Sequence, residues 1–146
     1  QARALMDNQD AYLRTQAIFL AYDMSDRIRA NKEEWQGAIA SGDIDTLSTA
    51  KYSFCSAYDP EGNLSTPLSK PVECSAIEMI QYDVYRWKAD ANSILGGGTV
   101  KMELANDKNT TLGDLDIIRL TIDWNRFNQA SQGKLGKAIY TLDVRP

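Results

Sequence analysis

Few residues in this chain of 146 have the type and spacing that chemistry requires. Histidine is absent, which removes the Ser-His-Asp and Cys-His groupings and the commonest metal ligand. Two cysteines without histidine cannot supply the four ligands of a structural zinc site. Carboxylates alone can hydrolyse glycosides, but no pair among the 20 acidic residues is marked out from the others. We therefore expect no enzymatic activity and no cofactor.

Three short motifs carry weaker signals. Asp43-Ile44-Asp45 places carboxylates at alternate positions, but the glycine and terminal glutamate of an EF-hand calcium loop are missing, so a solvated loop is expected and calcium binding is left open. Asn109-Thr110-Thr111 fits the glycosylation pattern, which arises often by chance in polar loops. Gly96-Gly97-Gly98 lies between an expected helix and an expected strand, an order that predicts a helix cap and turn rather than a phosphate-binding loop.

The two cysteines, Cys55 and Cys74, belong to a long polar segment. Residues 41–71 are rich in Ser, Gly, Asp, Asn and Pro, which predicts a surface loop that continues to Cys74. Long loops of this kind are usually functional or held by another constraint. We favour a Cys55–Cys74 disulfide, worth about 3 kcal/mol, over two free buried thiols. A disulfide implies an oxidising compartment.

The first 31 residues predict one uninterrupted helix. Long or apolar side chains recur at steps of three or four, and no proline or glycine occurs before Gly37. This stripe contains Leu5, Gln9, Leu13, Gln16, Leu20, Met24 and Ile28. Because the helix has no start signal, we expect that it once continued upstream of Gln1. Two structures are possible for residues 31–40. One is a short second helix with Asn31 and Glu34 as a capping box, and the other is a loop with one helical turn.

A second helix is expected over residues 75–95 and a small sheet over residues 99–145. Ser75 and Glu78 form a capping-box pattern, and Gly96 suits the helix end. After residue 98, apolar residues recur at every second position, as expected for strands. The expected inward residues of three strands are Val100, Met102 and Leu104; Ile118, Leu120, Ile122 and Trp124; and Ala138, Tyr140, Leu142 and Val144. Residues 1–146 are therefore expected to form one α+β domain in which helices cover an antiparallel meander.

A second line of residues advances four at a time along the first helix, opposite the main stripe. It contains Arg14, Ile18, Tyr22 and Asp26. These residues are either ordinary exposed side chains or the edge of a surface where another subunit packs. The net charge of −4 argues against a nucleic-acid partner, and only Arg126, Lys134 and Lys137, near Phe127, hint at a basic stripe.

The helix sequence resembles the PilV family of minor pilins, also described as type IV pilus modification proteins. The similarity lies in Asn8-Gln9-Asp10-Ala11-Tyr12-Leu13-Arg14-Thr15-Gln16-Ala17 and in Leu20-Ala21-Tyr22-Asp23-Met24-Ser25-Asp26-Arg27-Ile28-Arg29-Ala30-Asn31. The family usually has methionine at the position of Ile28. Beyond residue 31 the likeness is looser: a cysteine pair, a helix after the second cysteine, and a strand ending in Asp123-Trp124.

The resemblance implies a pilin fold and a structural role in a type IV pilus. Such pilins carry a cleaved leader and a hydrophobic helix half, which anchors in the inner membrane and later packs in the filament. Gln1 would then lie partway along the mature protein, and residues 1–31 would be the C-terminal half of the long helix. The implied location is the inner membrane, with the domain in the periplasm, and then the pilus.

The implied role is that of a minor pilin, in a complex that primes assembly and lies at the pilus tip. Its partners would be other minor pilins, the major pilin and an adhesin at the tip. One alternative is a receptor pilin that binds an adhesin, a host surface or DNA. Another is a minor pseudopilin of type II secretion, against which the PilV-like run argues.

The cysteine arrangement gives a first testable prediction. Protein from an oxidising compartment should carry the Cys55–Cys74 disulfide, and its mass should rise by two hydrogens on reduction, as mass spectrometry can measure. Thiol alkylation without reductant provides the control. Two alkylated cysteines in the unreduced protein would contradict the prediction.

Overall fold

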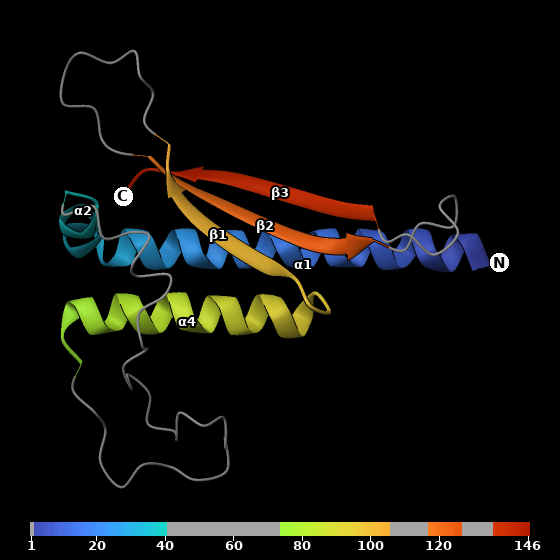
Figure 1. Ribbon diagram of the computed structural model, residues 1–146, viewed down its shortest axis with the longest axis horizontal. Helices are drawn as coiled ribbons and strands as arrows, with labels where there is room; N and C mark the ends of the chain where they lie inside the picture. The colour runs from blue at the N-terminus through green and yellow to red at the C-terminus, as the bar shows by residue number, and fades with distance from the viewer. Residues whose placement is uncertain (1, 41–73, 106–116, 127–135) are drawn as a thin grey trace, which may run out of the picture.

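The computed structural model describes residues 2–40, 74–105, 117–126 and 136–146. Helices and strands follow in the order expected for an α+β domain (Figure 1). They are α1 (Ala2–Ala30), α2 (Lys32–Ala40), α4 (Ala76–Ile94), β1 (Thr99–Leu104), β2 (Ile118–Arg126) and β3 (Gly136–Val144). The long first helix, the second helix and the three strands are confirmed. Residues 32–40 form a helix, which settles the alternative left open there.

The three strands form an antiparallel meander in the order β1-β2-β3. Leu120 at the centre of β2 pairs with Met102 on one side and with Leu142 on the other. Side chains at alternate positions therefore gather on one face of the sheet. All inward residues of β2 are buried, and those of β1 and β3 are buried or packed against the same core.

Two antiparallel helices cover that face (Figure 1). The helix α1 contacts β2 and β3, while α4 lies beside α1 and contacts β1. The two helices thus divide the sheet between them, with α4 over β1. The short helix α2 contacts both α1 and α4 and buries Trp35. The core lies between one helical layer and one sheet.

Only the C-terminal part of α1 is deeply buried. Ala17 and Ala21 are fully buried, and their small side chains allow close approach of the neighbouring elements. Leu20, Met24 and Ile28 are also buried, as expected, and Leu13 packs against the core. The expected stripe is wrong at its start, because Leu5 is 71% exposed. The reason is geometric: the N-terminal end of α1 projects beyond the sheet and beyond α4 (Figure 1).

The ends of α4 are fixed by local hydrogen bonds. The capping box is present: the backbone N–H of Glu78 donates to the Ser75 hydroxyl at 3.4 Å, and the Ser75 N–H donates to the Glu78 carboxylate at 2.8 Å. The Ser75 N–H and the Ser75 hydroxyl, which donates to the same carboxylate at 2.9 Å, lower the pKa of Glu78 below its usual value. At the other end, the Gly97 N–H donates to the Asn92 carbonyl at 2.8 Å, and Gly96 has a positive φ of 60°. This is the Schellman arrangement expected of a glycine end.

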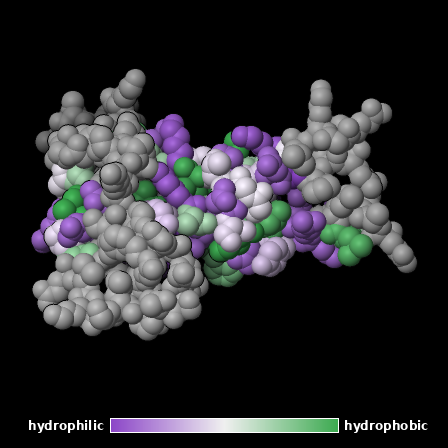
Figure 2. Space-filling view, turned by 60° about the horizontal axis from the view of Figure 1, so that its bottom comes forward, coloured by the Kyte–Doolittle hydropathy of each residue, from purple (hydrophilic) through white to green (hydrophobic). Residues whose placement is uncertain are grey.

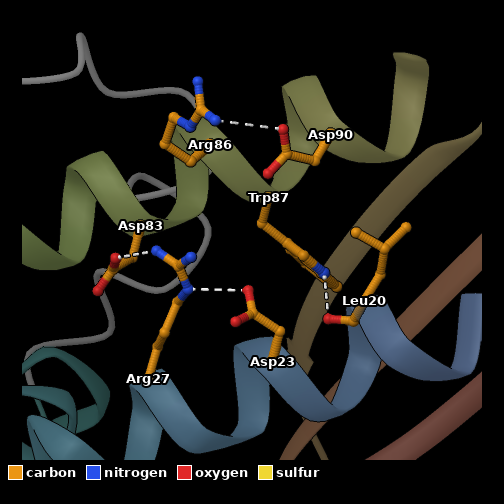
Figure 3. A network of polar contacts seen from close by, with 7 residues as sticks. All are labelled: Leu20, Asp23, Arg27, Asp83, Arg86, Trp87 and Asp90. Carbon is orange, nitrogen blue, oxygen red and sulfur yellow. Dashed lines mark hydrogen bonds and ion pairs between the residues drawn. The ribbon is translucent and has the colours of Figure 1, made fainter. Parts of the chain in front are cut away.

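A polar clamp joins α1 to α4 (Figure 3). The Trp87 Nε1–H donates to the Leu20 carbonyl at 3.0 Å, although that oxygen lies within a helix. The Arg27 Nη1 donates to Asp83 at 2.6 Å, and its Nε donates to Asp23 at 2.9 Å. The Arg27–Asp23 pair joins adjacent turns of α1, whereas Asp83 lies 56 residues along the chain from Arg27.

The clamp contains a carboxylate that is costly to bury. The Asp83 side chain is only 8% exposed, while that of Arg27 is 34% exposed. Burial raises the pKa of Asp83 above its usual 3.8, and the hydrogen bond and positive charge of Arg27 oppose that rise. Burial also lowers the pKa of Arg27, but Asp83 and Asp23 outweigh it and raise that pKa. Arg27 is therefore the group that keeps Asp83 charged inside the fold.

Burial of α1 predicts the effect of a matched pair of truncations. Leu20→Ala should lower the free energy of unfolding by about 2–5 kcal/mol, because it leaves a cavity at a buried position. Leu5→Ala, the same change on the same helix at an exposed position, should change it by less than about 0.5 kcal/mol. Urea unfolding followed by circular dichroism measures both. Similar losses for the two variants would contradict the observed packing of α1.

The clamp predicts a pH-dependent loss of stability. Arg27→Met keeps most of the aliphatic volume but leaves Asp83 buried without its cation, so unfolding free energy at pH 7 should fall by about 2 kcal/mol. This value is below that of fully buried pairs because Arg27 is partly exposed. Without Arg27 the folded pKa of Asp83 rises further. In this variant, protonated Asp83 stabilises the fold at pH values below 3.8, the usual pKa of the residue. That stabilisation is lost as the pH rises through the pKa of Asp83 in the folded state.

The cost of Arg27→Met should therefore be greatest near neutral pH and shrink as the pH falls toward 3.8. Chemical unfolding at a series of pH values measures this trend. Asp23→Asn is the control, because it removes only the exposed partner of Arg27 and should cost about 0.5 kcal/mol. A loss that is constant with pH would show that Asp83 does not carry the effect.

Candidate interaction surface

Large apolar side chains line the side of α1 that faces away from the sheet. Leu5, Tyr12 and Phe19 are separated by seven residues each, so on a helix they drift by only about 20° per step and lie nearly in line. Tyr22 follows Phe19 by three residues and lies beside it. We call these four residues the outward stripe. Phe19 is 64% exposed and Tyr22 52%, and Leu5 and Tyr12 are also exposed.

Exposed apolar groups interrupt an otherwise polar helical surface. Figure 2 brings the α4 side of the molecule forward and shows hydrophobic side chains among polar ones in the middle of the domain, and again toward the free end of α1. Single exposed apolar residues are common, but aromatic side chains in line on one helix are typical of contact surfaces. The outward stripe is therefore the candidate interaction surface.

The four interface residues expected from the sequence are only partly brought together. Tyr22 is exposed and belongs to the outward stripe, whereas Ile18 is half-buried at its flank. Asp26 is exposed and lies 3.6 Å from Arg29. Arg14 lies on another side of the helix and lines a pocket. Sequence reasoning missed Leu5, Tyr12 and Phe19 as surface residues, although their seven-residue spacing was a usable signal. An interface role for Arg14, Ile18, Tyr22 and Asp26 stays a prediction.

The pocket lies where α1 emerges from under the sheet. It has a volume of about 270 Å³, and its helical wall is one face of α1, because its residues are three or four positions apart. The strands β2 and β3 form the other wall. The lining residues are Asp7, Asp10, Ala11 and Arg14 from α1, Trp124 and Arg126 from β2, and Ala138 from β3. Ala138 pairs with Trp124 across the sheet, and its small side chain leaves the space open.

Charges in the pocket are only partly paired. The Arg126 Nε and Nη2 both lie 2.6 Å from the Asp10 Oδ2 and tie the end of β2 to α1. Within the described part of the chain, neither Arg14 nor Asp7 makes a hydrogen bond or an ion pair. The Trp124 Nε1 is buried and has no acceptor among the described residues. A buried donor without an acceptor costs about 1–3 kcal/mol, so this end of the core is imperfectly satisfied.

The outer face of the sheet is charged but internally paired. Arg119 donates to Asp143 through two nitrogens, at 2.8 and 2.9 Å, and Lys101 lies 2.6 Å from Glu103. These contacts lower the pKa values of Asp143 and Glu103. Lys137 lies 3.9 Å from Asp123. Two of the three residues that hinted at a basic stripe, Lys137 and Arg126, are thus close to acids; Lys134 and Phe127 lie outside the described residues.

Several sequence motifs also lie outside the described residues: Asp43 to Asp45, Asn109 to Thr111, and Cys55. Cys74 is half-buried immediately before the Ser75 cap of α4, but the Cys55–Cys74 disulfide stays a prediction. Where the structure describes the chain, no three acidic or cysteine side chains are grouped as a metal site would need. Within the same residues, no helix has the length and apolar character needed to cross a membrane.

Comparison with known proteins agrees with this architecture. A family model for Tt1218-like proteins, described as type IV pilin Tt1218, matches residues 1–85. The match covers more than half of the chain and includes α1, α2 and the first part of α4. No curated protein and no solved structure gives a significant match. A long N-terminal helix packed on a small antiparallel sheet, together with this match, shows that the chain belongs to the Tt1218-like family of type IV pilins.

Proposed function

We propose that this pilin is a minor subunit that joins other minor pilins in a complex that primes pilus assembly and lies at the tip. The observation that carries the proposal is the outward stripe of α1, in which Tyr12 and Phe19 are exposed nearly in line and Tyr22 is exposed beside Phe19. Membership of the pilin family supports a structural role in a filament. The PilV-like sequence of residues 8–31 supports the minor role.

The physical argument rests on what the stripe can contribute to association. Aromatic side chains bury large areas with few rotatable bonds, and such residues often carry most of the energy of an interface. Among the described residues, α4 and the sheet fill the core side of α1, while the outward side is exposed and can meet another subunit. Assembly through this side requires no catalytic group.

The proposed partners are other minor pilins and the major pilin, together with an adhesin at the tip. Before assembly we place the protein at the inner membrane, with this domain in the periplasm, and after assembly in the pilus at the cell surface. We do not assign a nucleic-acid partner. The basic residues described near Trp124 are Arg126 and Lys137, and each of them has an acidic neighbour.

A complementation experiment tests the proposal. In the organism that carries the gene, a deletion strain should lose most surface pili, and expression of the Phe19→Asp or Tyr22→Asp variant should fail to restore them. One interface anchor of about 2 kcal/mol lowers occupancy roughly thirtyfold. Electron microscopy and sheared-pilus yield measure the result. Circular dichroism of the purified domains should show that both variants fold, because the positions are exposed.

The matched control is Ile139→Asp. Ile139 is 64% exposed, as Phe19 is, but lies on the outer face of β3. This variant should restore normal piliation. Normal piliation in the deletion strain, with only adhesion or DNA uptake lost, would instead favour a receptor pilin. Loss of protein secretion without loss of pili would favour a type II secretion pseudopilin.

A further inference from the structure

We propose that the pocket between α1 and the end of the sheet binds a carboxylate group carried by a neighbouring pilin subunit. Two residues that line the pocket, Arg14 and Trp124, carry N–H donors without an acceptor among the described residues. The pocket lies next to the N-terminal end of α1, which projects beyond the sheet (Figure 1). The inference rests on the proposed assembly role only for the source of the carboxylate.

Arg14 is the principal donor. Its guanidinium carries five N–H groups and remains protonated in proteins. Within the described residues, none of these N–H groups has an acceptor. A planar fork of this kind matches the two oxygens of a carboxylate. Arg14 comes from the exposed flank of α1, so an incoming group reaches it without rearrangement of the core.

Trp124 and Arg126 supply the opposite wall. The Trp124 Nε1–H is buried and lacks an acceptor among the described residues, so an oxygen that entered beside it would satisfy an unused donor. Arg126 uses Nε and Nη2 on Asp10, which leaves further N–H groups on the same guanidinium. The indole face provides an apolar surface for the carbon atoms next to the carboxylate.

The charges of the four ionic lining residues sum to zero, so the preference for an anion rests on the unused N–H donors and not on net charge. Of the two acids in the pocket, Asp10 is engaged by both nitrogens of Arg126, at 2.6 Å. Asp7 is the only lining acid without an ion pair in the described part of the chain, and it opposes an anion. Arg14 and the remaining hydrogens of Arg126 oppose Asp7 from the same pocket. Removal of the Asp7 charge should therefore strengthen binding, which gives the proposal a sign that can be tested.

The size of the pocket fits one side chain. Its volume of about 270 Å³ is at or below the lower limit for sites that enclose a drug-sized ligand. An aspartate or glutamate that projects from a second protein needs less space and brings its own backbone to the rim.

Nuclear magnetic resonance of the ¹⁵N-labelled domain tests the site directly. The chain has three tryptophans, and Trp124→Phe identifies which indole N–H signal belongs to Trp124. The probe is N-acetylglutamate amide, with N-acetylglutamine amide as its neutral match. The glutamate probe should move the Trp124 signal with a Kd of about 1–10 mM, a range suited to a contact that works within an assembled filament. The glutamine probe should leave the signal unmoved.

Three variants give opposite expectations. Arg14→Gln should weaken binding of the glutamate probe at least about tenfold, because it removes the charged fork. Asp7→Asn should strengthen binding about two- to fivefold, because it removes a like charge. Arg29→Gln changes an exposed arginine of the same helix outside the pocket and should leave the Kd unchanged.

Several outcomes would overturn the proposal. These are no shift of the Trp124 signal with the glutamate probe, an equal shift with the glutamine probe, or tighter binding of N-acetyllysine amide, which would mark a cation site. Acetate should bind more weakly than the glutamate probe; equal binding would assign the pocket to free small acids rather than to a subunit. These measurements use the isolated domain, so their failure is separate from the piliation result.

Discussion

The contact between α1 and α4 is the constraint on which the rest of the domain depends. The two helices form the layer on which the sheet lies: the main contacts of α1 are with β2 and β3, and α4 contacts β1. Their relative position is fixed by a buried hydrogen bond from Trp87 to the backbone of α1 and by the Arg27–Asp83 ion pair. Hydrophobic packing alone would allow the helices to slide by a turn, whereas two directional contacts, one to two turns apart along the helices, define one register.

The same contact explains why a costly carboxylate is tolerated in the interior. Burial raises the pKa of Asp83, so this residue does not stabilise the fold by its charge alone. Its benefit is specificity, since Arg27 can satisfy both Asp83 and Asp23 only when α4 lies in the observed position. The family match, over residues 1–85, contains both partners of this ion pair, while Trp87 lies just beyond it.

Local sequence signals were sufficient for most of the fold. The Ser75–Glu78 capping box, the glycine end of α4 and the alternation in the strands each depend on neighbours close in the chain, and all three are confirmed. The error at Leu5 has a different origin. Periodicity shows which residues share a side of a helix, but not how far the sheet extends beneath it. The pairing of Arg27 with Asp83 and the pocket at Arg14 also require the tertiary arrangement.

The distribution of charge indicates which surfaces are left for recognition. On the outer face of the sheet, acids and bases pair with one another, within β1 and between β2 and β3, so a partner that bound there would have to replace existing contacts. On α1, by contrast, aromatic side chains face outward and Arg14 has no acceptor within the described residues. The inner side of α1 packs in the core, while its other sides carry exposed aromatic groups and an arginine without an acceptor among the described residues. That division lets a small domain keep its fold while association depends on the residues the fold does not use.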